Sequence, residues 1–272
     1  MASLNEITPN QLMRLIGTPD TPVIVDVCIE GDFAEDPRLI PTAFRAPHTD
    51  MPALIDRLEG RPVVVACQKG KKLSQGVAAY LRSEGIAAEY LQGGIYGWRD
   101  AGMPLIPAAT LPEPINGSPL WVTKQRPKID RIACPWLIRR FVDPNARFLF
   151  VAPSEVAEVA EKFGATPFDG PNDFWGHRGE NCTFNTMIEE FGLQTESLMH
   201  LATLVRAADT NRHDLAPEAA GLLAISVGLS RVYKDDLTQL EAGILLYDAL
   251  YRWARDGRDE AHDTPAMQGH KK

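Results

Sequence analysis

The residues whose types and spacing most clearly favour chemistry surround Cys67. The segment from Ala66 to Ser74 reads Ala-Cys-Gln-Lys-Gly-Lys-Lys-Leu-Ser, after a β-branched run at 62–66 and at the start of a helical pattern that extends to 82. A cysteine between a strand and a helix faces the positive end of the helix dipole and free backbone N–H groups. The nearby lysines add positive charge, so both effects favour the thiolate over the thiol. We therefore expect a nucleophile, with a small buried hydrophobe as the inert alternative.

The elements that position this cysteine follow an alternating pattern. Thr8, Pro9 and Gln11 form a capping-box sequence for a helix that ends at Gly17. Further helices are expected at 52–58 and 74–82, and strands at 23–27, 62–66 and 87–91. Strands that alternate with short helices predict an α/β fold with a mostly parallel sheet and a site at the carboxyl ends of its strands. Cys67 lies at such an end.

Three motifs over roughly residues 5–106 resemble the rhodanese-like sulfurtransferases. They are Val25-Asp26-Val27, the loop from Cys67 to Lys72, and Leu91-Gln-Gly-Gly-Ile-Tyr-Gly-Trp98. The resemblance implies that the Cys67 thiolate attacks a sulfane sulfur donor, becomes a persulfide and passes the sulfur to a thiol or to cyanide, without a cofactor. In this interpretation Trp98 anchors the core and carries no chemistry. The residues of the implied substrate- and anion-binding loop are Gln68, Lys69, Gly70, Lys71 and Lys72.

Several positions depart from the family pattern. Lys72 stands where an arginine is usual, and a lysine cannot make the two parallel hydrogen bonds of a guanidinium group. Cys28 replaces the arginine that commonly follows Asp-Val. Leu39-Ile-Pro-Thr-Ala43 replaces the usual His-Ile-Pro-Gly-Ala. These changes weaken the case for thiosulfate as the physiological donor but not for persulfide chemistry. Related phosphatases carry an arginine where this chain has Leu73, so phosphatase chemistry is not expected. Cys28 is either a resolving thiol or, as we favour, an inert strand-end thiol.

Composition restricts the class of protein. The 272 residues are 44% hydrophobic with a net charge of −8, and no long basic segment is available to neutralise nucleic-acid phosphates. The N-terminal residues lack a signal-peptide pattern and no apolar run is long enough to span a bilayer. The four cysteines are widely and irregularly spaced, which fits neither a disulfide framework nor a zinc knuckle. We expect a cytoplasmic protein that binds small molecules, with nucleic acid and membrane unlikely as partners.

A proline-rich stretch at 103–119 divides the chain. We predict a rhodanese-like domain at 1–106, a linker at 107–119, a second domain at 120–255 and a disordered tail at 256–272. The second domain alternates two or three strands with helices and then becomes helical, which predicts a mainly helical α+β fold. Pro135 must lie near a helix start or kink the helix.

The second domain resembles the carboxyl-terminal domain of the chromate resistance protein family. The stretches that carry the resemblance are Asp130-Arg-Ile-Ala-Cys-Pro-Trp-Leu-Ile138, Pro167-Phe-Asp169, His177 with Cys182-Thr-Phe184, and Ala207-Ala-Asp209. The resemblance implies a role in chromate resistance or in sensing an oxyanion or redox stress.

Ligand-type residues gather in the helix-end loops of this domain. We hypothesise that His177 and Asp209, with Asp130, Glu180 or His213, converge on a divalent metal, and that Arg131 and Arg178 attract an anion. The alternative is a histidine that only makes ordinary hydrogen bonds. Cys134 and Cys182 are expected to be buried thiols.

Two functional classes follow. The first is a sulfurtransferase that acts through Cys67 in chromate or oxidative stress. The second is a sensor or regulatory protein in which Cys67 reads oxidants or sulfane sulfur without turnover.

Overall fold

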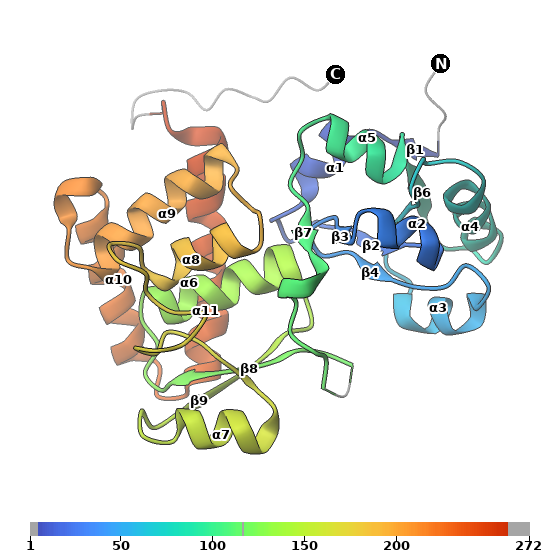
Figure 1. Ribbon diagram of the computed structural model, residues 1–272. Helices are drawn as coiled ribbons and strands as arrows, with labels where there is room; N and C mark the ends of the chain where they lie inside the picture. Colours follow the sequence, from blue (N-terminus) through green and yellow to red (C-terminus); the bar gives the residue numbers. More distant parts are fainter. Residues whose placement is uncertain (1–4, 116, 261–272) are drawn as a thin grey trace.

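Two lobes lie side by side in the computed structural model, which describes residues 5–115 and 117–260 (Figure 1). The first lobe holds β1 (Glu6–Ile7), α1 (Pro9–Leu15), β2 (Val23–Asp26), α2 (Glu30–Glu35), β3 (Arg38–Leu39), β4 (Phe44–Arg45), α3 (Met51–Leu58), β5 (Val63–Ala66), α4 (Lys72–Ser83), β6 (Ala88–Leu91), α5 (Gly94–Asp100) and β7 (Ile106–Pro107). None of the helices in the described part of the chain combines the length and the hydropathy needed to cross a membrane.

The mostly parallel sheet expected for this lobe is confirmed. Its strand order is β1-β6-β5-β2-β4 and every pairing is parallel. Figure 1 shows α5 on one side of the sheet and α3 on the other. All four residues of β2 and of β5 are buried, because strands covered on both faces have no polar side to present to solvent. Asp26 pairs with Ala66, so β2 and β5 end together at the edge where Cys67 begins the next loop.

Local signals set the helix starts of the first lobe. The predicted capping box of α1 is present, with the Thr8 side chain accepting from the Gln11 backbone and the Gln11 side chain accepting from Thr8. Helix α4 begins at Lys72, two residues before the predicted start at Ser74. The Ser74 hydroxyl donates to the Lys71 carbonyl, 3.2 Å away, which places Ser74 inside the first turn.

The second lobe is mainly helical around a small sheet, as predicted. Its elements are β8 (Leu120–Lys124), α6 (Asp130–Leu137), the π-helical turn η2 (Ile138–Val142), β9 (Arg147–Val151), α7 (Val156–Phe163), β10 (Thr166–Pro167), α8 (Thr183–Glu190), α9 (Glu196–Asp209), η3 (His213–Leu215), α10 (Ala219–Val232), α11 (Asp236–Arg252) and η4 (Trp253–Gly257). The strands run parallel in the order β10-β8-β9. Pro135 lies inside α6, which passes into η2 shortly afterwards.

The lobes share one hydrophobic core. Gly17 packs closely against the second lobe, because a Cβ there would overlap the ring of Phe141 and lie 2.8 Å from Tyr251. The backbone N–H of Thr42 donates to the Phe141 carbonyl at 2.8 Å.

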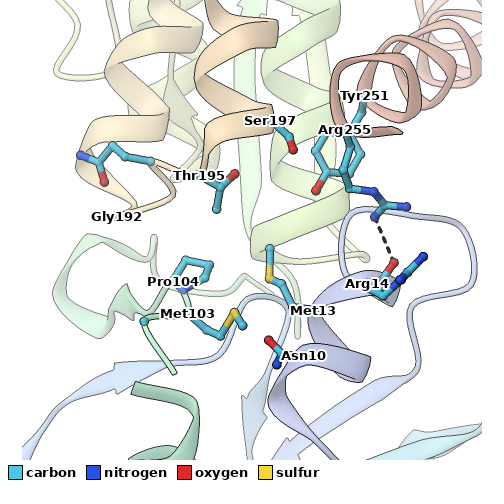
Figure 2. A pocket seen from close by; sticks show the side chains of 12 residues that line it. Asn10, Met13, Arg14, Met103, Pro104, Gly192, Thr195, Ser197, Tyr251 and Arg255 are labelled. Atoms are coloured by element: carbon cyan, nitrogen blue, oxygen red, sulfur yellow. Dashed lines mark hydrogen bonds between the residues drawn. The ribbon is translucent and has the colours of Figure 1, made fainter. Parts of the chain in front are cut away.

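A cleft opens between the lobes, and the Arg255 guanidinium crosses it to donate to the Arg14 carbonyl at 3.0 Å (Figure 2). The cleft contains no residue of the Cys67 loop.

The proline-rich segment between the lobes contacts the first one. Strand β7 pairs antiparallel with β3, and the N–H of Ala108 donates to the Pro37 carbonyl at 2.9 Å. A 3-10 turn, η1 (Ala108–Thr110), follows. At the other end of the second lobe, η4 continues to Gly257, and residues 261–272 of the expected disordered tail lie outside the described residues.

Candidate functional site

Cys67 lies where the sequence predicts it, directly after β5 and ahead of α4. The residue is 6% exposed, and its Sγ lies 3.2 Å from the Ser74 hydroxyl. Ser74 is fully buried in the first turn of α4 and was not singled out from the sequence. The hydroxyl is therefore a fixed polar neighbour for the sulfur at the base of the loop.

The carbonyl groups of the Cys67 loop are held by its neighbours. The N–H groups of Ile95 and Tyr96, in the first turn of α5, donate to the Cys67 and Gln68 carbonyls, both at 3.0 Å. The Gln75 side chain donates to the Gly70 carbonyl at 3.2 Å. By contrast, the backbone N–H groups at positions 68–71 meet no acceptor in the described part of the chain. A loop with engaged carbonyls and free N–H groups is suited to an anion.

Two glycines allow α5 to approach this closely. Gly70 has φ +65° and Gly94 has φ +61°, a region that favours glycine. A Cβ on Gly94 would overlap the Cys67 carbonyl oxygen and the Gly70 nitrogen. Trp98 completes this segment as predicted: it is fully buried and donates to the Pro104 carbonyl at 2.7 Å. The Gly-Gly…Gly-Trp segment thus positions the loop.

The lysines of the loop are exposed, and among the described residues none of them forms an ion pair. Lys69 lies with its Nζ 6.0 Å from the centre of the Tyr96 ring, and Lys72 is the first residue of α4. Their charge is therefore available to a substrate anion.

The loop rim also carries a carboxylate that the sequence did not indicate: Glu35 accepts from the Gln68 side chain at 2.8 Å and from the Tyr96 hydroxyl at 3.1 Å.

Cys28 lies at the same sheet edge as Cys67. Burial, and next the neighbouring Asp26 carboxylate, raise the pKa of Cys28 well above its usual value, so this thiol stays protonated. Asp26 accepts from the Cys28 backbone N–H at 2.8 Å, which is a structural role. Its other carboxyl oxygen is buried without a partner, and burial raises the pKa of Asp26. The inert role favoured for Cys28 stays a prediction, with the resolving role as its alternative.

The second lobe brings together three of the residues proposed as metal ligands. Asp130, His177 and Asp209 each place one ligand atom within 4.8 Å of the others. From His177 Nε2 the distances are 3.5 Å to Asp130 Oδ2 and 3.3 Å to Asp209 Oδ2. Asp169 Oδ1 lies 3.4 Å from the same nitrogen. Asp169 was not proposed as part of this group, although its place directly after a strand end was a usable signal. We call these four residues the Asp–His cluster.

Element ends position the cluster. Asp130 begins α6, Asp209 ends α9, and Asp169 follows β10 at the carboxyl end of the three-stranded sheet. Helix α8 points its first turn at the group: the N–H of Thr183 donates to Asp130 Oδ2 at 2.6 Å, and its hydroxyl donates to Asp169 Oδ1 at 3.1 Å. The helix dipole therefore stabilises negative charge here.

The pKa values of Asp130, His177 and Asp169 are shifted in the cluster. Burial, followed by the charges of Asp209 and Asp169, raises the pKa of Asp130 to about 8. The polar contacts of its Nε2 with the Asp169 and Asp209 carboxylates raise the pKa of His177 to about 10. Burial alone would raise the pKa of Asp169, but His177, Lys124 and Arg131 outweigh it and hold that pKa below its usual value.

Other residues proposed for this site do not join it. Glu180 is exposed, and neither Glu180 nor His213 belongs to the group of ligand atoms. The proposed anion role of Arg131 and Arg178 is not favoured, because Arg131 pairs with Asp169 at 3.3 Å and Arg178 pairs with Glu190. Cys134 and Cys182 are fully buried, as predicted. Neither forms a disulfide in the described part of the chain.

Comparison with known families matches both halves of the chain. Residues 8–101 match the rhodanese-like domain, and residues 121–254 match the ChrB C-terminal domain. A curated relative, Protein ChrB of Cupriavidus metallidurans, is 35% identical over 133 residues, which is 48% of this chain and 39% of the relative. The chain thus spans well under half the length of this curated relative.

Solved structures of rhodanese-like proteins are similar to part of the chain. A rhodanese-like domain protein from Staphylococcus aureus is 28% identical, covering 35% of this chain and 91% of its own, with a TM-score of 0.31. A thiosulfate sulfurtransferase from Pseudomonas aeruginosa is 23% identical, covering 39% of this chain and 20% of its own, with a TM-score of 0.33. By its two family matches, the chain joins a rhodanese-like domain to a C-terminal domain of the ChrB family.

Proposed function

We propose that this protein is a rhodanese-type sulfurtransferase that forms a persulfide on Cys67 and works in chromate or oxidative stress resistance. The observation that carries the proposal is the Cys67 loop, in which the Cys67, Gln68 and Gly70 carbonyls accept hydrogen bonds while the N–H groups at 68–71 meet no acceptor among the described residues. The ChrB match supports the link to chromate. Small-molecule sulfur donors and thiol acceptors are the proposed partners, and sulfur transfer needs no cofactor.

In the first half-reaction the Cys67 thiolate attacks the outer sulfur of a sulfane donor. An S–S bond forms to Cys67, the donor's S–S bond breaks, and its electron pair leaves with the donor remainder, which is sulfite when the donor is thiosulfate. The product is an anionic persulfide on Cys67. Free N–H groups and exposed lysines around the loop stabilise this charge.

In the second half-reaction an acceptor removes the outer sulfur. A thiolate or cyanide attacks it, the Cys67 S–S bond breaks, and the bonding pair returns to Cys67 as thiolate. The acceptor leaves as a persulfide or as thiocyanate. The Ser74 hydroxyl lies 3.2 Å from both Sγ and the Lys71 carbonyl, so it can turn its hydrogen from that carbonyl to the anionic sulfur in both steps.

The charges around the loop favour a persulfide or polysulfide over thiosulfate as the donor. Lys72 can attract thiosulfate but cannot grip it with two parallel hydrogen bonds. Glu35, bound to Gln68 and Tyr96, adds a negative group at the rim that opposes the charged SO3 end of thiosulfate, an end that a polysulfide lacks.

Sulfur transfer to cyanide tests the proposal. We expect wild type to transfer sulfur from polysulfide and, less efficiently, from thiosulfate. Cys67→Ser should be inactive, whereas the matched control Cys28→Ser should retain activity. A wild-type protein that transfers sulfur from neither donor contradicts the enzyme proposal.

One observation favours the sensor alternative. The two lobes share a core in which the Thr42 N–H donates to the Phe141 carbonyl, so a change at one lobe has a direct structural path to the other. A sensor would modify Cys67 once and fail to turn over, whereas an enzyme would release many equivalents of thiocyanate per chain. Multiple-turnover kinetics therefore separate the two functions.

A further inference from the structure

We propose that Asp130, His177 and Asp209 bind one divalent first-row transition metal ion, such as Zn²⁺ or Mn²⁺, in the second lobe. This site is separate from the Cys67 loop. The residues come from α6, from the loop between β10 and α8, and from the end of α9.

The distances between the ligand atoms fit shared coordination. His177 Nε2 lies 3.5 Å from Asp130 Oδ2 and 3.3 Å from Asp209 Oδ2. Ligands bound tetrahedrally at about 2.1 Å from Zn²⁺ are separated by about 3.4 Å. The observed spacings are close to this edge length and longer than the usual N–H···O hydrogen bond of about 2.9 Å.

One polar atom of the cluster is buried without a hydrogen-bond partner among the described residues, which is an observation independent of the distances. Asp130 is 1% exposed, and its Oδ1 accepts no hydrogen bond in the described part of the chain. A carboxylate is taken out of water only where a partner compensates it. His177 cannot supply that compensation alone, because its single Nε2 hydrogen can serve only one of the three carboxylates around it.

Charge balance selects a divalent ion. Asp169 has its own cations, with Lys124 Nζ at 3.6 Å and Arg131 Nε at 3.3 Å. Asp130 and Asp209 form ion pairs only with His177 in the described chain. Two carboxylates and a neutral imidazole around a divalent cation sum to zero, so the three side chains can hold such an ion as a group without net charge.

The site also has room for exchange with solvent. His177 has 44% of its side chain exposed, while the two aspartates are more buried, so the group is covered on one side only. Three protein ligands with solvent access are typical of a metal that keeps an open position. Asp169, anchored by Lys124, Arg131 and Thr183, is placed to accept a hydrogen bond from a water bound there.

The experiment uses the full chain, freed of any polyhistidine tag and stripped with a chelator. Calorimetric titration with ZnCl₂ and with MnCl₂, and metal analysis after dialysis, should give one ion per chain for at least one of the two. Because loss of an outer partner alone weakens metal binding about 10–100-fold, loss of a ligand in Asp209→Asn or His177→Ala should exceed about 100-fold.

Glu180→Gln is the matched control, since it removes a carboxylate from the same loop outside the cluster and should bind as wild type. Circular dichroism and the thermal transition of each metal-free variant verify folding, and His177→Gln replaces His177→Ala if the latter unfolds. Absence of stoichiometric binding of either ion overturns the proposal. Equal metal affinity in wild type, Asp209→Asn and the His177 variant also overturns the proposal. In that case protonated His177 is the counter-ion of the surrounding carboxylates.

Discussion

Replacing Gly94 by alanine should disrupt the Cys67 loop without touching a side chain that does chemistry. A Cβ at this position would overlap the Cys67 carbonyl oxygen and the Gly70 nitrogen, and would lie 2.9 Å from the Lys69 carbonyl carbon. These atoms are backbone and cannot rotate away. The N–H of Ile95, the next residue, holds the Cys67 carbonyl at 3.0 Å, so α5 cannot retreat without releasing the loop.

The magnitude follows from two effects. Gly94 has φ +61°, and an alanine in that left-handed region costs about 1–2 kcal/mol. Forcing extra volume against packed atoms costs about 1–3 kcal/mol more. The free energy of unfolding should therefore fall by about 2–5 kcal/mol, which corresponds to a drop in Tm of roughly 5–15 °C for a protein of this size. Sulfur transfer should fall by at least about tenfold, because the free N–H groups are displaced.

Gly76→Ala is the matched control. Gly76 lies inside α4 in open space, with no atom within 4 Å of a Cβ. The same substitution should stabilise the protein there by about 0.5–1 kcal/mol through helix propensity and leave activity unchanged. Urea unfolding and sulfur transfer to cyanide measure both variants. If Gly94→Ala matches wild type in both assays, the proposed contact between α5 and the loop is refuted.

Three further substitutions probe the first lobe. Lys72→Arg should lower the KM for thiosulfate about threefold or more by restoring a bidentate grip, and an unchanged KM would contradict that role. Glu35→Gln should raise kcat/KM for thiosulfate severalfold by removing a rim charge while retaining a side chain that can bond Tyr96; equal rates would show that the charge is screened. Because burial raises the folded-state pKa of Asp26, its stability contribution is fully present below the ordinary aspartate pKa near 3.9 and is lost as pH rises from there through the raised folded-state pKa. Asp26→Asn should thus stabilise the protein by about 1 kcal/mol at pH 7, with the gain disappearing below about pH 4 in urea unfolding.

Signals local in sequence predicted much of the structure. The capping box at Thr8 and Gln11 and the strand before Cys67 depend on neighbours within a few residues, and the structure confirms them. The parallel sheet follows from alternating strands and helices. The convergence of Asp130, His177 and Asp209 was expected from ligand-type residues at helix ends, and the structure brings these three together.

What the sequence could not predict depends on contacts between distant segments. Glu35 reaches Gln68 from a helix 33 residues earlier in the chain, and no local pattern indicates that pairing. Asp169 joins His177 only because β10 and the following loop fold back onto α6 and α9. The docking of the lobes likewise depends on Gly17 meeting Phe141, a contact that the proline-rich segment between the lobes does not reveal.

Intact-protein mass spectrometry after incubation with polysulfide and with thiosulfate tests the central claim most directly. We predict a gain of one sulfur atom on Cys67 that cyanide or a thiol removes. The gain should be absent in Cys67→Ser but present in Cys28→Ser. A chain that gains no sulfur from either donor, or that carries it on a different cysteine, would contradict persulfide formation on Cys67.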